Sequence, residues 1–432
     1  MSEQGHGRRP VYVVDGSRTP FLKARGRPGP FTPVDLAVAA GRPLLLRQPF
    51  AADALDEVIL GCVSPRADEV NPARIAALRL GCGERVPAWT VQRNCASGMQ
   101  SVETAARSIA DGRADLILAG GSEALSHSPI LFNDQMVGWL ADLNGARSIW
   151  AKLAVAARFR PGFLAPVIGL IKGLTDPVVA LNMGQTAEVL SAKFDISRED
   201  MDALALESHQ RTARAQDAGD LTEIEPIFDT RGGYYEHDDG VRPNNSMEAL
   251  GKLRPAFERP FGTVTPGNSS QITDGAAWLI LASEDALTRH RLKPLGRIVD
   301  SEWAALDPAQ MGLGPVHAAT PILQRHDLAL DDVDAWEINE AFAAQVLACI
   351  AAWQDRDYCR DNLGLRDAMG TLDQARLNLD GGAISVGHPV GSSGARITLH
   401  LLHVLRRKGV KRGIAAICIG GGQGGALLLE AA

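Results

Sequence analysis

The feature that most constrains this chain of 432 residues is the glycine-rich segment Gly381–Gly394, which reads GGAISVGHPVGSSG. Glycine at this density lets the backbone pass close to a ligand or to another strand, where a side chain would block the approach. His388 lies in the middle of the segment, ahead of the predicted helix 395–407. A helix N-terminus presents backbone N–H groups that have no partner within the helix. A lone histidine is usually structural, but this setting favours a functional site.

Cys95 lies at a second strand-to-helix turn, in the segment Arg93–Gly98 (RNCASG). An extended apolar stretch around Trp89–Val91 precedes it. The helix that follows is predicted from apolar residues three and four positions apart: Met99, Val102, Ala106 and Ile109. The helix N-terminus is expected to favour the thiolate of Cys95 over the thiol, as a nucleophile requires. The alternative is a buried apolar cysteine.

Two further segments place polar groups at predicted strand ends. Asn339–Phe342 (NEAF) follows the predicted strand 335–338, and a buried amide or carboxylate there must find hydrogen-bond partners. Asn339 could instead be a plain helix cap. Cys418–Gly420 ends the predicted strand 413–419 and runs into a glycine loop. A second cysteine at the entrance to such a loop indicates a site shared with His388 and Cys95.

In combination these segments resemble the thiolases, which make or cleave the carbon–carbon bond of 3-ketoacyl-CoA. Asn94–Gly98, Gly381–Gly394 and Cys418–Gly420 are similar to the three signatures of that family. Asn339–Phe342 and Gly262–Gly275 (GTVTPGNSSQITDG) also resemble family segments. The resemblance extends from about Val11 to Glu430.

The resemblance implies a role for each matching residue. Cys95 would carry the acyl group as a thioester, His388 would accept the proton of Cys95, and Cys418 would move the proton at the alpha carbon. One oxyanion would be bound by His388 with a water held by Asn339, and the other by the backbone N–H groups of Cys95 and Gly420. Coenzyme A would be a co-substrate, with no metal ion. The resemblance assigns four residues to substrate and CoA binding: Met183, Ser270, Ala341 and Phe342.

Within the family, the overall build is most like the β subunit of the fatty-acid-oxidation trifunctional enzymes. Those relatives usually have His at the position of Asn339, whereas Asn is usual in most other thiolases. Asn182 stands where short-chain biosynthetic thiolases have His before Met, which speaks against a strict acetoacetyl-CoA assignment. We therefore expect 3-ketoacyl-CoA thiolysis in β-oxidation, or the reverse Claisen condensation. The alternatives are a biosynthetic acetoacetyl-CoA thiolase, a decarboxylating or HMG-type condensing enzyme of the same fold, and a non-catalytic lipid-binding or scaffold subunit.

The order of predicted strands and helices indicates an α/β protein. Eight strands are predicted: 11–14, 57–62, 115–119, 277–281, 298–301, 335–338, 413–419 and 426–430. The two parts look like weak repeats, each with a site residue, a glycine-bearing helix, a strand and a Gly-Gly pair. The resemblance implies duplicated βαβαβαββ halves in five αβαβα layers. We expect one half at 8–124 with 255–288, an inserted loop domain at 125–254, and the other half at 289–432.

Composition limits the setting of the protein. The net charge of −7 speaks against nucleic acid as a partner. Its six cysteines contain no C-x-x-C pair, so reduced thiols and a cytoplasmic location are expected. The N-terminal segment MSEQGHGRRP has no apolar h-region or transit-peptide character, so export is not expected.

Asn144–Thr175 differs from the rest of this acidic chain, because it has five basic residues and no Asp or Glu. Its apolar run 163–174 has only twelve residues and contains Pro166, so it is too short to span a bilayer. The segment is expected to lie on anionic membrane, to receive a hydratase/dehydrogenase α subunit, or to cover the acyl tunnel as a lid. We also expect a homodimer or a dimer of dimers, with peripheral contact to the inner membrane.

Overall fold

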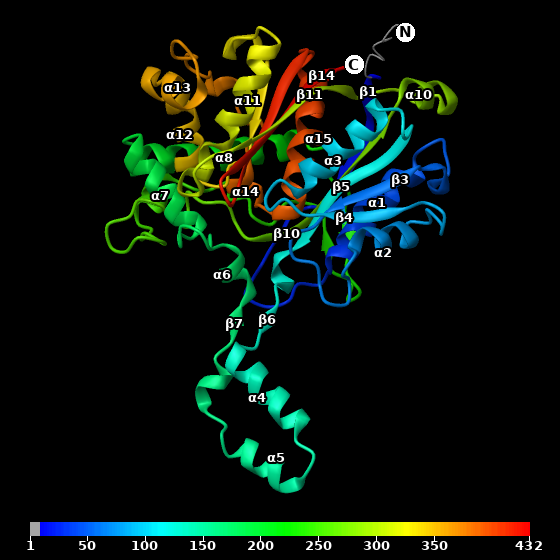
Figure 1. The fold of residues 1–432 in the computed structure, drawn as a ribbon. Coiled ribbons are helices and arrows are strands. Elements are labelled where there is room, and N and C mark those ends of the chain that lie inside the picture. Colours follow the sequence, from blue (N-terminus) through cyan, green and yellow to red (C-terminus); the bar gives the residue numbers. More distant parts are fainter. Residues whose placement is uncertain (1–8) are drawn as a thin grey trace, which may run out of the picture.

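The computed structural model describes residues 9–432. Most of the N-terminal segment used to predict targeting, and residue 8 of the first predicted half, lie outside this range. Strands and helices alternate along both halves of the chain (Figure 1). Each of the eight predicted strands overlaps a strand of the large sheet, so these predictions are confirmed with shifted ends.

Besides two two-stranded sheets, β6-β7 and β8-β9, the described residues form one ten-stranded sheet. Its strands are β1 (Val11–Arg18), β2 (Leu22–Lys23), β3 (Glu57–Gly61), β4 (Ala88–Val91), β5 (Leu116–Ala124), β10 (Thr273–Ala282), β11 (Gly296–Ala305), β12 (Ala335–Ile338), β13 (Arg412–Ile419) and β14 (Gln423–Ala431). The helices of the two halves are α1 (Pro33–Leu46), α2 (Pro72–Arg79), α3 (Ser97–Ala110), α10 (Glu284–His290), α11 (Gly314–Arg325), α12 (Ala343–Gln354), α13 (Arg356–Leu363), α14 (Ala383–Val386) and α15 (Val390–Lys408). The segment between the halves contains β6 (Ile130–Leu131), α4 (Asp134–Gly145), α5 (Ile149–Ala156), β7 (Val167–Ile168), α6 (Gly169–Gly173), α7 (Met183–Lys193), α8 (Arg198–Ala218), β8 (Ile227–Phe228), β9 (Tyr234–Tyr235) and α9 (Met247–Gly251).

β1 joins the two halves of the sheet. The strand order is β12-β13-β14-β11-β1-β10-β5-β3-β4, with β2 paired to β10. β1 is antiparallel to β10, with Tyr12 opposite Ala282, and antiparallel to β11, with Val11 opposite Ile298. The first strand of the chain therefore completes its pairing with two strands that lie more than 250 residues later in the sequence.

The strands are buried on both faces, which produces alternating layers. In β5, Ile117 and Ala119 belong to a central apolar cluster, whereas Leu116 and Leu118 belong to an outer one. The central cluster contains α3, α15 and the inner faces of both halves of the sheet. One outer cluster contains α1 and α2, and the other contains α11 and α12. The predicted α/β class and five-layer αβαβα arrangement are confirmed.

α3 and α15 form the middle layer and approach each other closely near their N-termini. A Cβ atom at Gly98 would lie 2.8 Å from the carbonyl oxygen of Gly391. A Cβ atom at Gly394 would lie 2.5 Å from the backbone nitrogen of Met99. Only glycine permits this approach. Because the predicted nucleophile lies just before α3 and the predicted base just before α15, this contact brings both segments to one place.

The second half departs from the first at its third strand. The first half runs β1-α1-β3-α2-β4-α3-β5-β10, but the counterpart of β4 in the second half is reduced to one bridge between Trp336 and Leu377. The Asn378 side chain hydrogen-bonds the N–H of Ile338 at 2.9 Å and its carbonyl oxygen at 3.0 Å. The Asn378 side chain thus forms the hydrogen bonds that a neighbouring strand would form with Ile338. After Asn378 the chain continues to α14 and then to His388.

An arm, residues 130–168, projects away from the body of the protein (Figure 1). β6 and β7 pair as its stalk, and α4 and α5 form its tip. α7 and α8, by contrast, pack on the second half, against α12 and α14. Within residues 9–432, no helix combines the length and apolar character that crossing a membrane requires.

Candidate active site

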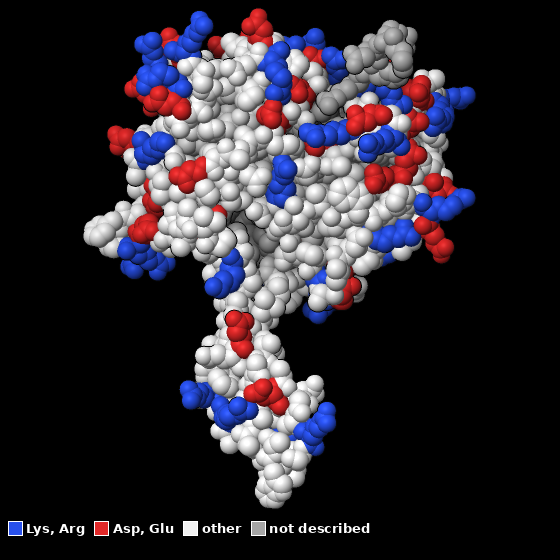
Figure 2. Space-filling view, in the orientation of Figure 1, with Lys and Arg blue, Asp and Glu red and all other residues white. Residues whose placement is uncertain are grey.

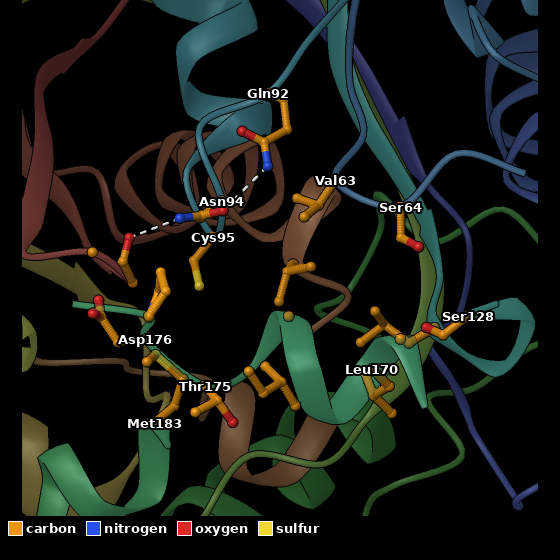
Figure 3. Close-up of a pocket in the computed structure, with 18 of the residues that line it drawn as sticks. Val63, Ser64, Gln92, Asn94, Cys95, Ser128, Leu170, Thr175, Asp176 and Met183 are labelled. Atoms are coloured by element: carbon orange, nitrogen blue, oxygen red, sulfur yellow. Dashed lines mark hydrogen bonds between the residues drawn. The ribbon is translucent and has the colours of Figure 1, made fainter. Parts of the chain in front are cut away.

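Cys95 opens into a cavity of about 370 Å³ (Figure 3). The turn that presents it is built from its neighbours: Asn94 has a left-handed φ of 41°, and Ser97 Oγ accepts the N–H of Arg93 at 2.8 Å and donates to the carbonyl of Asn94 at 2.7 Å. Cys95 is partly buried, and its sulfur points into the cavity. The predicted strand, turn and helix around Cys95 are confirmed.

The end of β13 reaches the same cavity from the other half of the molecule. The Asn94 Nδ2 donates to the carbonyl oxygen of Gly420 at 2.7 Å, which fixes the two turns to each other. The backbone N–H groups of Gly420 and Cys95 act to lower the pKa of the Cys95 thiol. Cys418 is fully buried and lies close enough to Cys95 for a charge on Cys95 to raise the pKa of the Cys418 thiol. The geometry therefore provides two N–H donors and a second thiol beside the first.

His388 lies two residues before the start of α15 and is buried. Its backbone N–H donates to the carbonyl of Gln271 at 3.0 Å, and its Nδ1 lies 2.6 Å from Ser393 Oγ. The Ser393 hydroxyl donates to the Pro389 carbonyl at 3.2 Å, so it accepts from Nδ1–H. This tautomer leaves a lone pair on Nε2, for which residues 9–432 provide no hydrogen-bond partner. A buried acceptor without a partner is costly, which indicates that a substrate group or water completes it.

Asn339, at the end of β12, also has buried polar side-chain atoms without hydrogen-bond partners in the described chain. Its backbone N–H donates to Ala416 O at 3.0 Å, but neither polar atom of its buried side-chain amide has a hydrogen-bond partner in the described chain. A helix cap would use the side-chain oxygen on a backbone N–H, so the cap alternative does not fit. The free amide can hold a water molecule or a substrate oxygen.

The pKa values correct one expectation about Cys95. Burial raises the pKa of the Cys95 thiol, and the N–H bonds from Gly420 and Cys95 oppose this rise without reversing it. The prediction that the helix N-terminus favours a resting thiolate is therefore wrong, because desolvation outweighs the helix end. Burial, with a smaller contribution from Arg396, lowers the pKa of His388 to about 3. The resting pair is a neutral thiol and a neutral imidazole, which remains a base throughout the neutral pH range.

The residues assigned to substrate binding divide into two groups. Met183 lines the cavity. Ala341 and Phe342 do not line it but pack in one apolar cluster with Cys418 and Met183. Ser270 does not line it either, and its N–H donates to the carbonyl of Ala341 at 2.9 Å. The structure thus places one of the four at the cavity wall and three beside the Cys418 side of the site.

Sequence reasoning missed much of the cavity wall. The other apolar and small residues that line it include Val63, Ser64, Leu125, Ser128, Pro129, Gly169, Leu170, Gly173 and Leu174. Val63 and Ser64 follow β3, which is parallel to β4. Ligands bind at the carboxyl ends of parallel strands, so the position of β3 beside the Cys95 strand was the signal that could have identified them. α6 lies within 144–175, for which a lid over the acyl tunnel is one of the expected alternatives, so the sequence does indicate this part of the wall.

Comparisons with known proteins agree with this geometry. Residues 11–285 match the model of the thiolase N-terminal domain, and residues 292–431 match that of the thiolase C-terminal domain. The chain belongs to the thiolase family. It is 36% identical to the bovine mitochondrial trifunctional enzyme subunit beta, over 98% of this chain and 88% of that protein. It is 40% identical to the beta-ketoadipyl-CoA thiolase of Pseudomonas aeruginosa, over 98% and 99% of the two chains.

A solved structure extends the comparison to the fold. Human mitochondrial 3-ketoacyl-CoA thiolase in complex with CoA has a TM-score of 0.83 and 38% identity, over 98% of each chain. The predicted thiolase-like fold is therefore confirmed, and this thiolase is an acyltransferase, as predicted.

Proposed function

We propose that this thiolase cleaves 3-ketoacyl-CoA with CoA to acetyl-CoA and a shortened acyl-CoA, through an acyl group on Cys95. The observation that carries the proposal is the pair of unpartnered buried polar groups, Nε2 of His388 and the amide of Asn339, together with a cavity lined by Cys95 and by Val390, which lies two residues after His388. A structural histidine and asparagine would be hydrogen-bonded to the protein.

The chemistry follows from these positions. His388 Nε2 takes the proton of Cys95 as the sulfur attacks the 3-keto carbon of the substrate. The N–H groups of Cys95 and Gly420 stabilise the oxyanion on the carbon bound to sulfur. The bond between the second and third carbons then breaks. The acetyl-CoA enolate is stabilised by His388 and by water on Asn339, and it receives a proton from Cys418. The thiol of CoA then gives its proton to Cys418 as its sulfur attacks the thioester, which releases acyl-CoA, and His388 returns its proton to the sulfur of Cys95.

The cavity wall favours an uncharged acyl chain. Among the described residues that line it, none is Lys, Arg or His. Its one charged side chain is the buried carboxylate of Asp176, which accepts the N–H groups of Val178 and Val179. A second carboxylate on the acyl chain, as in a beta-ketoadipyl group, would be buried without a cation and beside Asp176. We therefore assign uncharged medium or long 3-ketoacyl chains, with β-oxidation as the pathway.

The test is thiolysis of 3-ketoacyl-CoA from C4 to C16, followed as loss of substrate absorbance, with 3-ketoadipyl-CoA as a charged comparison. We expect kcat/KM to be highest for medium or long chains and about 100-fold lower for the charged substrate than for an uncharged chain of equal length. The highest kcat/KM at C4 would support the biosynthetic acetoacetyl-CoA alternative instead. Absence of thiolysis with all of them would support a non-catalytic subunit.

We further propose that the arm lies on anionic membrane, which would place a cytoplasmic protein at the periphery of the inner membrane. α5 exposes Ile149, Trp150 and Leu153, with Trp150 77% exposed. Figure 2 shows cations and acidic side chains on the arm beside broad uncharged surface, and Arg158 forms an ion pair with Asp142 at 3.0 Å. Apolar side chains next to Lys and Arg suit the boundary between lipid headgroups and acyl chains. One observation supports the alternative that the segment covers the acyl tunnel as a lid: α6, at the base of the arm, lines the cavity.

Charge reversal on the arm tests this proposal. We expect replacement of four cations by Glu to weaken co-sedimentation with anionic liposomes at least about 100-fold, since each cation near such a surface contributes about 1 kcal/mol. Binding of the unchanged protein should weaken as salt rises. The replaced residues are Arg147, Lys152, Arg158 and Arg160. A matched control reverses four exposed cations of the body: Arg42, Arg85, Arg113 and Lys293.

Three other results of the arm experiment would contradict membrane binding. Equal loss in the control would indicate a non-specific charge effect. Salt-insensitive capture of a hydratase/dehydrogenase α subunit, without liposome binding, would assign the arm to that partner. Loss of CoA affinity alone would support the lid.

We also propose a homodimer. β4 is the last strand of the sheet on its side, and its Trp89 is 37% exposed. A partly apolar edge strand offers unpaired backbone groups to a second copy of the chain. Sedimentation analysis of the purified protein measures the assembly directly.

A further inference from the structure

Two buried carboxylates flank the segment that carries His388. Glu123 is the penultimate residue of β5, and Glu340 follows Asn339 after β12; both are almost completely buried. No described Lys, Arg or His lies within ion-pair distance of either. A buried carboxylate without a cation is costly, so each must be held by hydrogen bonds.

Glu123 accepts hydrogen bonds from two sides of the active site. Its Oε2 accepts the N–H of Val63 at 2.9 Å and the N–H of Gly391 at 3.1 Å, and its Oε1 accepts the N–H of Ser64 at 3.0 Å. Val63 and Ser64 line the cavity, whereas Gly391 lies three residues after His388 in the first turn of α15. Glu123 thus connects the cavity wall to the helix that follows the base.

Glu340 forms the equivalent connection on the other side. Its Oε2 accepts the N–H of Ile384 at 3.2 Å and the hydroxyl of Ser208 at 2.7 Å. Its Oε1 accepts the Asn378 amide at 2.8 Å. Ile384 lies four residues before His388, and Glu340 is bonded directly to Asn339 in the chain.

Glycines leave room for both carboxylates against the backbone. A Cβ atom at Gly391 would lie 2.7 Å from the Glu123 Oε2, and one at Gly382 would lie 2.4 Å from the Glu340 carboxyl carbon. At both places the carboxylate fits only because its neighbour is glycine, since any larger residue there would overlap the carboxylate. Part of the glycine density around His388 has its explanation here, since two glycines of that segment face a carboxylate.

We propose that Glu123 and Glu340 are positioning residues that hold the backbone on both sides of His388, so that Nε2 faces Cys95 in the proposed reaction. The proposal rests on the role of His388 as the base in that reaction. Burial raises the pKa of both carboxyl groups, with Glu123 at about 7. The charged and titratable groups near them are Cys62 and Cys95 for Glu123, and Arg396 and Glu337 for Glu340.

The test uses Glu123→Gln and Glu340→Gln. A glutamine side chain has one acceptor oxygen, and its NH₂ group must face a donor, so at least one bond is lost. In Glu123→Gln this bond joins the cavity wall or Gly391, and in Glu340→Gln it joins Asn378 or both Ile384 and Ser208. We expect kcat to fall about 10- to 100-fold in each variant, with KM within threefold, because the base is displaced while substrate contacts remain. The matched control is Glu188→Gln. Glu188 also accepts two backbone N–H groups, from Thr263 and Val264, but far from His388 in the chain; its kcat should stay within twofold.

A double-variant cycle separates positioning from general stability. In a His388→Ala background, Glu123→Gln and Glu340→Gln should change kcat less than twofold, since there is no imidazole left to orient. An unchanged kcat in the folded single variants, or the same fall in both backgrounds, overturns the proposal. If a glutamine variant does not fold, Glu123→Asp and Glu340→Asp keep the charge but shorten the reach, and the same comparison applies.

A substrate-free readout keeps this proposal distinct from the proposed function. Alkylation of Cys95 by iodoacetamide, measured by mass spectrometry, should be at least fivefold slower in His388→Ala and in both glutamine variants. If the wild type cleaves no 3-ketoacyl-CoA but alkylation follows this pattern, the proposed function fails and the positioning role stands. Slowing in His388→Ala without slowing in the glutamine variants overturns the positioning role alone.

Discussion

Replacement of Cys95 by alanine is expected to reduce turnover at least about 10⁴-fold, because it removes the atom that forms the acyl bond. The fold should be retained, since Cys95 is at the cavity wall and alanine fills most of its volume. Steady-state thiolysis and circular dichroism measure the two parts of this expectation.

Intact-mass measurement after mixing with 3-ketoacyl-CoA provides the control for Cys95. The wild type should gain the mass of the shortened acyl group, and the alanine variant should not. An adduct mapped by peptide analysis to any other residue would show that Cys95 is not the nucleophile. Cys62 is the useful comparison, because burial and the adjacent Glu123 raise its pKa well above the usual range and should keep it unmodified.

Replacement of Cys418 by serine should separate the two thiols. Burial and the proximity of Cys95 raise the pKa of the Cys418 thiol, which places it closer to the pKa of the alpha C–H that it must protonate and deprotonate. A serine hydroxyl ionises far less than a thiol, so almost no alkoxide is present to take the alpha proton, and exchange of the acetyl-CoA alpha protons with deuterium should fall at least about 100-fold. NMR of acetyl-CoA in deuterated buffer measures the exchange.

The Cys418→Ser variant should still become acylated at Cys95, because the Cys95 sulfur, the Gly420 N–H and His388 are unchanged. We therefore expect an acyl adduct on Cys95 together with loss of exchange of the alpha protons. Normal exchange in Cys418→Ser would mean that Cys418 has a structural role. Loss of both would mean that the substitution disturbs the turn at Gly420, which is hydrogen-bonded to Asn94.

Much of the fold and the identity of the four central residues could be predicted because they depend on local pattern. β5 and β13 are apolar on both faces, so their strands are evident as continuous runs. Cys95, His388, Asn339 and Cys418 each occur in a short segment with specific neighbours, and those neighbours build the turns. The left-handed φ of Asn94 is an example of a residue type matched to its turn.

The remaining features depend on the tertiary environment. The protonation of Cys95 is set by how deeply both halves bury it, which no local pattern gives. The third strand of the second half is absent because the Asn378 side chain takes its hydrogen bonds from forty residues away. The connections made by Glu123 and Glu340 to Gly391 and Ile384 likewise join distant positions. The path of residues 130–168 away from the body is also a tertiary property, since its helices could equally have folded back.

The position of β1 between β10 and β11 has a consequence for synthesis of the protein on the ribosome. Tyr12 pairs with Ala282 and Val11 with Ile298, so the first strand emerges long before its neighbours exist. At elongation rates of about 5–20 residues per second, the nascent chain carries an unpaired apolar strand for roughly 15–55 s. During that time the strand can be shielded only by incomplete structure or by a chaperone. The connection that unites the two halves in the finished enzyme thus makes early translation its most aggregation-prone stage.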